Sequence, residues 1–186
     1  MTLPADQDLG LIFRALLYSA QAHRDQRRKD RPRSPYINHP IQVAELLWRV
    51  GGVTDPATLV AALLHDTVED TGAKPADVRR RFGEQVLDLV LEVSDDKSLP
   101  RAERKRRQIE TAAMKSTGAK LIKLADKICN LRDLVQSPPV DWPLERRQDY
   151  ARWTEKVVAG LRGTNPALEG LYDQELETAK RELGLA

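Results

Sequence analysis

The chain has a single cysteine, Cys129, among its 186 residues. One thiol excludes an intrachain disulfide and any zinc site built from several cysteines. Residues 1–6 contain neither a basic stretch nor an apolar one, so we expect no secretory signal there. No apolar run approaches the roughly 18–20 residues that span a bilayer. These absences predict a cytoplasmic protein that does not insert into membranes.

A strong net charge is also missing. The formal net charge of +2 is too small to favour a general nucleic-acid binder. The basic residues are clustered at 27–29, 79–81 and 101–107, and no nucleic-acid motif accompanies them. Such separate clusters suit a small polyanion better than a nucleic acid. The length fits one domain over residues 1–186, with no internal repeat or linker.

Alternating strand patterns are absent, and every clear apolar period is helical. Asp55-Pro56 and Asn165-Pro166 have the cap-plus-proline pattern of helix starts, and Gly51 and Gly52 suit a helix end. We therefore predict an all-α bundle of about eight to ten helices. The expected helices include segments near 9–20, 38–50, 76–82, 84–93, 102–115, 119–135 and 141–161.

The most unusual segment joins an apolar helix to a cluster of charges. Residues 59–64 are apolar on all sides, which predicts an enclosed helix. We expect this helix to continue through His65, Asp66, Glu69 and Asp70 and to stop at Gly72. On one helix the four ionisable side chains would share an arc of roughly 140°. Their burial is costly unless a metal or other partners compensate them.

Histidine is scarce, with three in the chain. His39 at a predicted helix start and Asp126 on the polar face of another helix can join His65 and Asp66 in one site. Two imidazoles and two carboxylates suit a divalent transition metal such as manganese, iron or zinc. A helix cap for His39 and a surface salt bridge for Asp126 are the alternatives. For His23, which continues an apolar stripe, we expect packing and not ligation.

Longer strings around these residues resemble a known family. They are PYINHP at 35–40, ALLHDTVEDT at 62–71, KLADK at 123–127 and NLRDL at 130–134. They resemble the hydrolase domain of the RelA/SpoT stringent-response enzymes, within the HD phosphohydrolase superfamily. The resemblance is greatest to stand-alone alarmone hydrolases of the metazoan SpoT homologue type. It covers nearly the whole chain, with Cys129, where relatives more often have tyrosine, as a small departure.

The resemblance implies an activity and a set of roles. The activity is hydrolysis of the 3′-pyrophosphate of ppGpp or pppGpp to GDP or GTP and pyrophosphate. Glu69 and Asp70 would position the attacking water and take its proton. The expected ligands of one manganese ion per chain are His39, His65, Asp66 and Asp126. The expected contacts to substrate are Arg28 at the guanine, and Lys29, Lys97, Asn130 and Tyr150 at sugar and phosphates.

Other functions stay open at this stage. The same site could act as a phosphatase on NADPH or another nucleotide, because phosphate and ribose contacts are generic. A non-catalytic alarmone-binding module is a further alternative, although Glu69 and Asp70 are both present. Arg28 and Lys29 alone could form a solvated basic loop. The expected partner is a small guanosine nucleotide, with no nucleic acid or membrane, and the oligomeric state is open.

Overall fold

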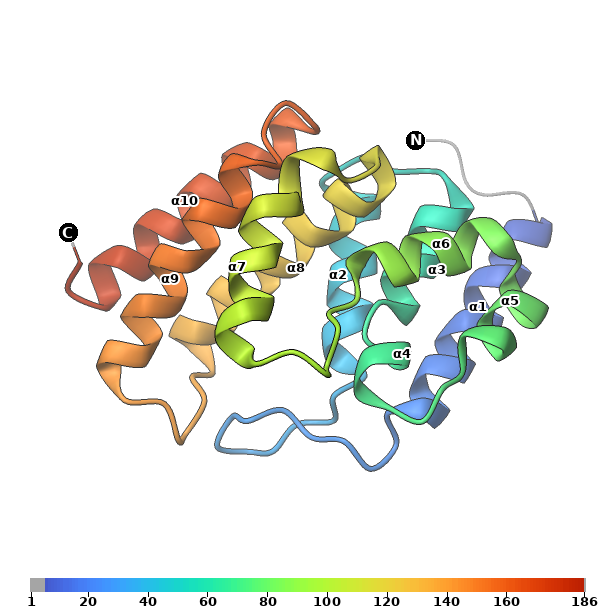
Figure 1. Cartoon of the computed structure of the whole chain (residues 1–186), viewed down its shortest axis with the longest axis horizontal. Helices are drawn as coiled ribbons and strands as arrows, with labels where there is room; N and C mark the ends of the chain where they lie inside the picture. Colours follow the sequence, from blue (N-terminus) through green and yellow to red (C-terminus); the bar gives the residue numbers. More distant parts are fainter. Residues whose placement is uncertain (1–5, 186) are drawn as a thin grey trace.

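The computed structural model describes residues 6–185, in which helices are joined by loops (Figure 1). It contains ten α-helices and one short 3₁₀ helix, which confirms the predicted all-α fold of about eight to ten helices. The helices are α1 (Asp6–Ala22), α2 (Asn38–Arg49), α3 (Pro56–Leu64), α4 (Thr67–Asp70), α5 (Pro75–Phe82), α6 (Glu84–Val93), α7 (Arg101–Thr111), the 3₁₀ helix η1 (Ala112–Met114), α8 (Thr117–Gln136), α9 (Leu144–Ala159) and α10 (Pro166–Glu182).

Helix α3 lies at the centre of the core, as its apolar sequence predicts. Every residue from Thr58 to Leu64 is buried, and the helix packs against α1, α2, α6 and α8. The Asp55 side chain accepts a hydrogen bond from the Thr58 backbone N–H at 2.9 Å, and Pro56 occupies the first turn. A capped, fully enclosed helix of this kind is a rigid support for the residues that follow it.

Helix α8 is the second central element. It runs for 20 residues and packs against α2, α3, α6, α9 and α10. Besides its apolar residues it buries three charged ones, Lys123, Asp126 and Lys127. Burial of charge is costly unless partners compensate it. This run of buried charges therefore marks the part of the core where a function is expected.

The structure corrects one prediction about the helices. The expected continuous helix through residues 56–72 was wrong: α3 ends at Leu64, and the short helix α4 begins at Thr67. The buried Thr67 hydroxyl donates to the Leu64 backbone carbonyl at 2.7 Å, which satisfies the helix end at the break. His65 and Asp66 thus lie in a turn between two helices. The shared 140° arc of one helix end does not apply to their side chains.

Other boundaries differ by a few residues. Helix α7 ends at Thr111 and continues as the 3₁₀ turn η1, and α9 begins at Leu144 instead of near 141. Pro143 has an extended backbone, with ψ of 162°, and therefore stands before the helix. Within residues 6–185 no helix combines the length and apolar character needed to cross a membrane. The cytoplasmic location stays a prediction.

Candidate functional site

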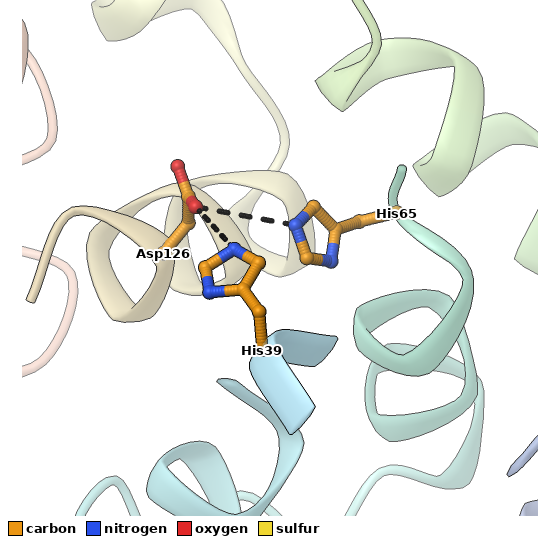
Figure 2. Close-up of side chains that lie close together, drawn as sticks. All are labelled: His39, His65 and Asp126. Atoms are coloured by element: carbon orange, nitrogen blue, oxygen red, sulfur yellow. Dashed lines mark hydrogen bonds and ion pairs between the residues drawn. The ribbon is translucent and has the colours of Figure 1, made fainter. Parts of the chain in front are cut away.

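Three side chains from three parts of the fold meet in the core. His39 lies in the first turn of α2, His65 directly follows α3, and Asp126 lies near the middle of α8. One ligand atom from each lies within 4.8 Å of the other two, and all three residues are buried (Figure 2). Among the described residues, this group satisfies the spacing that a single metal ion requires. The structure thus brings together three of the four predicted metal ligands.

Asp66, the fourth predicted ligand, borders this group of three. Its Oδ2 atom lies 3.0 Å from Nε2 of His65 and 4.0 Å from Nε2 of His39. The same oxygen accepts a hydrogen bond from the Tyr36 hydroxyl at 2.5 Å. Because His65 and Asp66 are consecutive in the turn between α3 and α4, both side chains can face one centre.

The histidine geometry fits a divalent metal. The His65 ring donates from Nδ1 to the Ala62 carbonyl at 2.7 Å, since a carbonyl can only accept. This bond fixes the ring and leaves Nε2 as an acceptor, the arrangement typical of metal-binding histidines. His65 Nε2 is buried, and the polar atom next to it is Asp66 Oδ2 at 3.0 Å, from the carboxylate expected to share the ion. A buried polar atom of this kind is costly unless an ion satisfies it. Imidazole and carboxylate donors together suit a divalent transition metal.

Electrostatics keep the carboxylates of this centre ionised. Asp126 is hydrogen-bonded by Lys127 Nζ at 2.8 Å and Asn130 Nδ2 at 2.6 Å, and His39 Nε2 lies 3.1 Å away. Burial works against the charge, but Lys127 and His39 hold the pKa of Asp126 well below its usual range. Burial lowers the pKa of His65, but Asp66 and Asp126 outweigh it and raise that pKa to about 9. The two carboxylates thus favour a positive charge at Nε2, which is a proton in the metal-free protein and which a bound metal ion would replace. The centre therefore attracts a cation.

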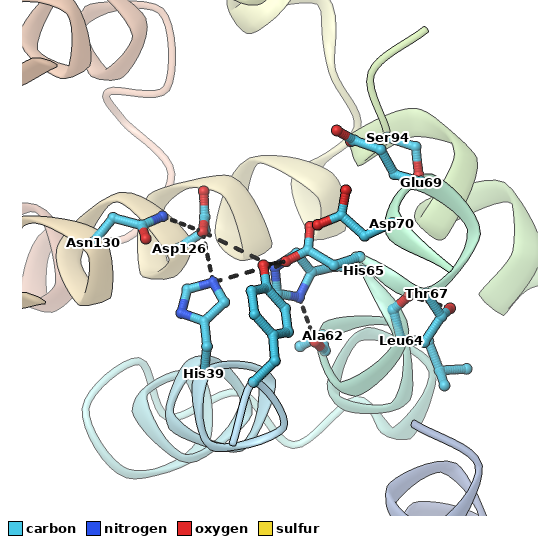
Figure 3. A network of polar contacts seen from close by, with 12 residues as sticks. His39, Ala62, Leu64, His65, Thr67, Glu69, Asp70, Ser94, Asp126 and Asn130 are labelled. Atoms are coloured by element: carbon cyan, nitrogen blue, oxygen red, sulfur yellow. Dashed lines mark hydrogen bonds and ion pairs between the residues drawn. The ribbon is translucent and has the colours of Figure 1, made fainter. Parts of the chain in front are cut away.

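The predicted catalytic carboxylates lie on α4, beside this centre (Figure 3). Glu69 Oε2 accepts from the Asp95 backbone N–H at 2.7 Å, and Asp70 Oδ1 accepts from Lys97 Nζ at 2.5 Å. Burial raises the pKa of Glu69 despite the Asp95 hydrogen bond. A carboxylate with a raised pKa is a better proton acceptor near neutral pH than an ordinary one.

A pocket of about 480 Å³ opens beside these residues. This volume is in the range of about 300–1,000 Å³ that holds small organic ligands. Four of the five predicted substrate contacts line it: Arg28, Lys29, Asn130 and Tyr150. The fifth, Lys97, is absent from the lining but is bonded to Asp70, which does line the pocket. Asp70, one of the two catalytic carboxylates, lines the pocket directly, and Asn130 connects the pocket to Asp126 through its hydrogen bond to that carboxylate.

Arg28 has a defined position in this pocket. Its guanidinium is ion-paired with Asp133 and lies 5.5 Å from the centre of the Tyr36 ring. Its backbone N–H donates to the Ser34 carbonyl at 2.8 Å, within the loop that precedes α2. Arg28 is half-buried, whereas Lys29 is exposed. The interpretation as a solvated basic loop therefore fits Lys29 but not Arg28.

Sequence reasoning missed several residues of the site. Tyr36 lines the pocket, bonds Asp66 and packs against His39, with ring centres 5.8 Å apart. Asp133 and Trp142 also line the pocket. Tyr36 had a detectable signal, because it stands three residues before His39 in the PYINHP string. Asp133 had none beyond its position in NLRDL, since its partner Arg28 is distant in the sequence.

His23 behaves as predicted, as a packed side chain. It is buried, its Nδ1 lies 2.6 Å from Gln26 Oε1, and its ring centre is 4.9 Å from that of Tyr36. Gln26 in turn donates to Asp70 at 3.3 Å. His23 therefore supports two residues that border the site, and it lies outside the group of three that could hold an ion.

Comparison with known proteins agrees with this geometry. The model of the HD domain matches residues 15–166, most of the chain. The chain belongs to the HD-domain family. The matched range contains the adjacent pair His65-Asp66. The match extends from α1 to the start of α10 and so includes every residue of the site.

Close relatives narrow the membership further. The chain is 52% identical to guanosine-3′,5′-bis(diphosphate) 3′-pyrophosphohydrolase MESH1 of Xenopus tropicalis over 166 residues, 89% of this chain and 93% of that protein. It is 54% identical to the Homo sapiens protein of the same name, over 85% of this chain and 88% of that one. A solved structure described as "A metazoan ortholog of SpoT hydrolyzes ppGpp and plays a role in starvation responses" matches with a TM-score of 0.88 and 49% identity, covering both chains completely.

Proposed function

We propose that this chain hydrolyses the 3′-pyrophosphate of ppGpp or pppGpp, giving GDP or GTP and pyrophosphate. The observation that carries the proposal is a buried group of residues able to hold a metal ion, beside a carboxylate pair and a nucleotide-sized pocket. The names of the relatives, about half identical over most of their length, support the same reaction. The presence of Glu69 and Asp70 beside this group favours an enzyme over a binding module.

The metal, we propose, is one manganese ion held by His39, His65, Asp66 and Asp126. A divalent ion at this position supplies a Lewis acid that lowers the pKa of water and draws charge from a phosphate oxygen. The bond from His65 to the Ala62 carbonyl orients one ligand, and the Tyr36 hydroxyl orients Asp66. Such outer contacts tune the strength of metal binding.

The remaining steps belong to side chains of the chain itself. Arg28, Lys29, Asn130 and Tyr150 would position the nucleotide in the pocket, with Arg28 held by Asp133. Glu69 would take the proton of the attacking water, whose oxygen bonds to the inner phosphorus. The bond from that phosphorus to O3′ breaks, and O3′ leaves with a proton as part of GDP or GTP. Lys97 and Arg104, 3.6 and 3.9 Å from Glu69 Oε1, would offset the phosphate charge.

The proposal is tested by turnover of the purified protein. We expect release of pyrophosphate from ppGpp in the presence of manganese, loss of the activity with a chelator, and recovery when manganese is restored. Asp126→Asn should abolish activity, whereas Asp88→Asn, an exposed carboxylate on α6, should not change it. Wild-type turnover of NADPH at a higher kcat/KM than ppGpp would move the function to the alternative substrate. Full activity of the metal-free protein would contradict the metal role.

A further inference from the structure

A second, smaller cavity lies on the other side of Asp126 along helix α8. Its lining includes Lys123, whereas the nucleotide pocket is lined by Asn130. At about 1.5 Å and 100° per residue, Lys123 and Asn130 lie one turn before and one turn after Asp126, within an arc of roughly 60°. The helix therefore aligns the small cavity, the metal-binding group and the nucleotide pocket in this order.

Four cationic side chains line this cavity. Arg104 and Arg107 come from α7, Lys115 precedes α8, and Lys123 belongs to α8. Two carboxylates also line it, but each already has a partner. Asp95 accepts both bonds from the Gln108 amide, at 2.8 and 2.9 Å. Asp96 accepts from the Ser98 backbone and hydroxyl, at 2.9 and 2.6 Å. These partners are neutral, so both carboxylates keep their charge, and the four cations outnumber them. Arg107 also pairs with Glu103 at 3.2 Å and Lys115 donates to the Glu92 carbonyl at 2.5 Å, which leaves Arg104 and Lys123 as the cations to consider.

Lys123 is the unusual member of this lining. Only 8% of the residue is exposed, and within residues 6–185 its ammonium group has neither a hydrogen bond nor an ion pair. Lys127, one turn later on the same helix, is also buried but pairs with Asp126 at 2.8 Å. A buried cation without a partner is destabilising. Its presence in a cavity wall points to an anionic ligand that is bound there during function.

Arg104 connects the cavity to the catalytic carboxylates. It lines the cavity, and its NH1 atom lies 3.9 Å from Glu69 Oε1. Its Nε atom is buried and has no hydrogen-bond partner among the described residues. Two cationic side chains on different helices, Arg104 and Lys123, therefore each have unused donor capacity at this position. An anion bound between these two side chains would lie next to the catalytic carboxylate Glu69.

We propose that this cavity binds the outer phosphate of the 3′-pyrophosphate and then holds the pyrophosphate product. The proposal rests on the proposed function. If the nucleoside occupies the larger pocket and the inner phosphorus lies at the metal-binding group, the outer phosphate extends away from the ribose, toward Lys123. The cavity volume is about 180 Å³. This is below the roughly 300 Å³ at which pockets for organic ligands begin, so it suits an inorganic anion and excludes a nucleoside.

The test compares Lys123→Met with Lys120→Met, which removes the same charge from α8 outside the cavity lining. Three affinities are measured on the manganese-loaded protein: KM for ppGpp, Ki for inorganic pyrophosphate, and Ki for guanosine 5′-diphosphate 3′-monophosphate, which lacks the outer phosphate. In Lys123→Met the first two should weaken by about 10- to 100-fold, as expected for a lost charged hydrogen bond. The third should stay within about twofold of wild type, and Lys120→Met should change none of them.

Folding is checked in the same variants. Removal of an unpaired buried charge should leave the melting temperature of Lys123→Met equal to or above that of wild type. Burial lowers the pKa of Lys123. The charges of Lys127 and Lys115 lower it further, and those of Asp126 and Asp95 act in the opposite direction. At a pH below this lowered pKa, Lys123 is charged in both the folded and the unfolded state, and the folded state is destabilised by the buried charge. As the pH rises toward about 10.4, the ordinary pKa of lysine, the folded protein loses the proton before the unfolded chain does, and this destabilisation disappears. Any advantage of the variant should therefore shrink at high pH.

Two results would overturn the proposal. One is a Lys123→Met protein with wild-type affinity for both ppGpp and pyrophosphate. The other is an equal loss for all three ligands, which would mean a general disturbance around Asp126. If wild type did not turn over ppGpp, the proposed function would fail separately. Pyrophosphate binding by wild type, Lys123→Met and Lys120→Met, measured by calorimetry, would still decide whether the cavity is an anion site.

Discussion

At the scale of single residues, Glu69 and Asp70 differ although they are neighbours. Glu69 accepts from the Asp95 backbone N–H and lies 3.6 Å from Lys97 Nζ, whereas Asp70 accepts a hydrogen bond from the same ammonium at 2.5 Å. Burial raises the pKa of Glu69, which suits this carboxylate to accept a proton near neutral pH. We therefore assign the proton transfer to Glu69 and the orientation of Lys97 to Asp70.

This assignment predicts the behaviour of Glu69→Gln. The amide oxygen can still accept from Asp95, so the fold and nucleotide binding should be retained, while kcat falls by about 10²–10⁴-fold. Protonated Glu69 cannot accept a proton, so wild-type kcat/KM should fall as pH decreases through its raised pKa. The variant should lack that acidic limb. A pH–rate profile of both proteins checks this, and an unchanged kcat in the variant would make Glu69 structural.

The residue scale also shows how far a sequence can predict a site. His39, His65 and Asp126 were predictable because imidazoles and carboxylates are rare in apolar surroundings and here follow a known pattern. The pair Arg28–Asp133 spans 105 positions, so no local pattern indicates it. Lys123 and Arg104 were unpredictable for a related reason. Their sequence neighbours are ordinary, and only the folded chain brings them to the wall of one cavity.

At the scale of elements, a close contact joins the end of α9 to the 3₁₀ turn after α7. A Cβ atom at Gly160 would lie 2.7 Å from Ala112 Cβ and 3.0 Å from the Ala113 backbone nitrogen. Because one of these atoms is backbone, the contact cannot be relieved by a side-chain rotation. The turn η1 leads from α7, which carries Arg104, toward α8, which carries Asp126.

We expect Gly160→Ala to lower the free energy of unfolding by about 1–3 kcal/mol through overpacking. The matched control is Gly170→Ala within α10, where a Cβ atom meets nothing within 4 Å. There the higher helix propensity of alanine should stabilise the protein by up to about 1 kcal/mol. Thermal and urea unfolding of both variants measure the difference. Equal stabilities would show that α9 and η1 can separate at little cost.

The break between α3 and α4 illustrates which element boundaries escape prediction. Apolar periodicity and helix propensity continue through residues 56–70 without interruption. The break depends on the Thr67 hydroxyl, which bonds the Leu64 carbonyl, and on tertiary contacts that draw His65 and Asp66 to a common centre. Such side-chain bonds compete with the helical ladder only after the surrounding helices are in place.

At the scale of the whole molecule, metal binding is expected to stabilise the fold. The group of three connects α2, the end of α3 and α8, which are distant in the sequence. A ligand bound by the native state alone contributes about 2.7 kcal/mol at 100 times its Kd. Chelation should therefore lower the melting temperature by several degrees, and manganese should restore it. In His65→Ala the melting temperature should be the same with chelator and with manganese. A melting temperature that still rises with manganese in that variant would contradict the role of His65 as a ligand.

Helix α8 also limits how this sequence can vary over evolutionary time. Lys123, Asp126 and Asn130 share one side of the helix, and each added residue would advance the following ones by about 1.5 Å and turn them by about 100°. A single insertion between 123 and 130 would thus turn one end of the row by about 100° away from the other. Surface loops elsewhere tolerate insertions, but on a helix the position of a side chain along the axis and its direction around the axis change together with every added residue. We therefore expect related sequences to differ by substitutions in this part of α8 and to lack insertions or deletions between positions 123 and 130.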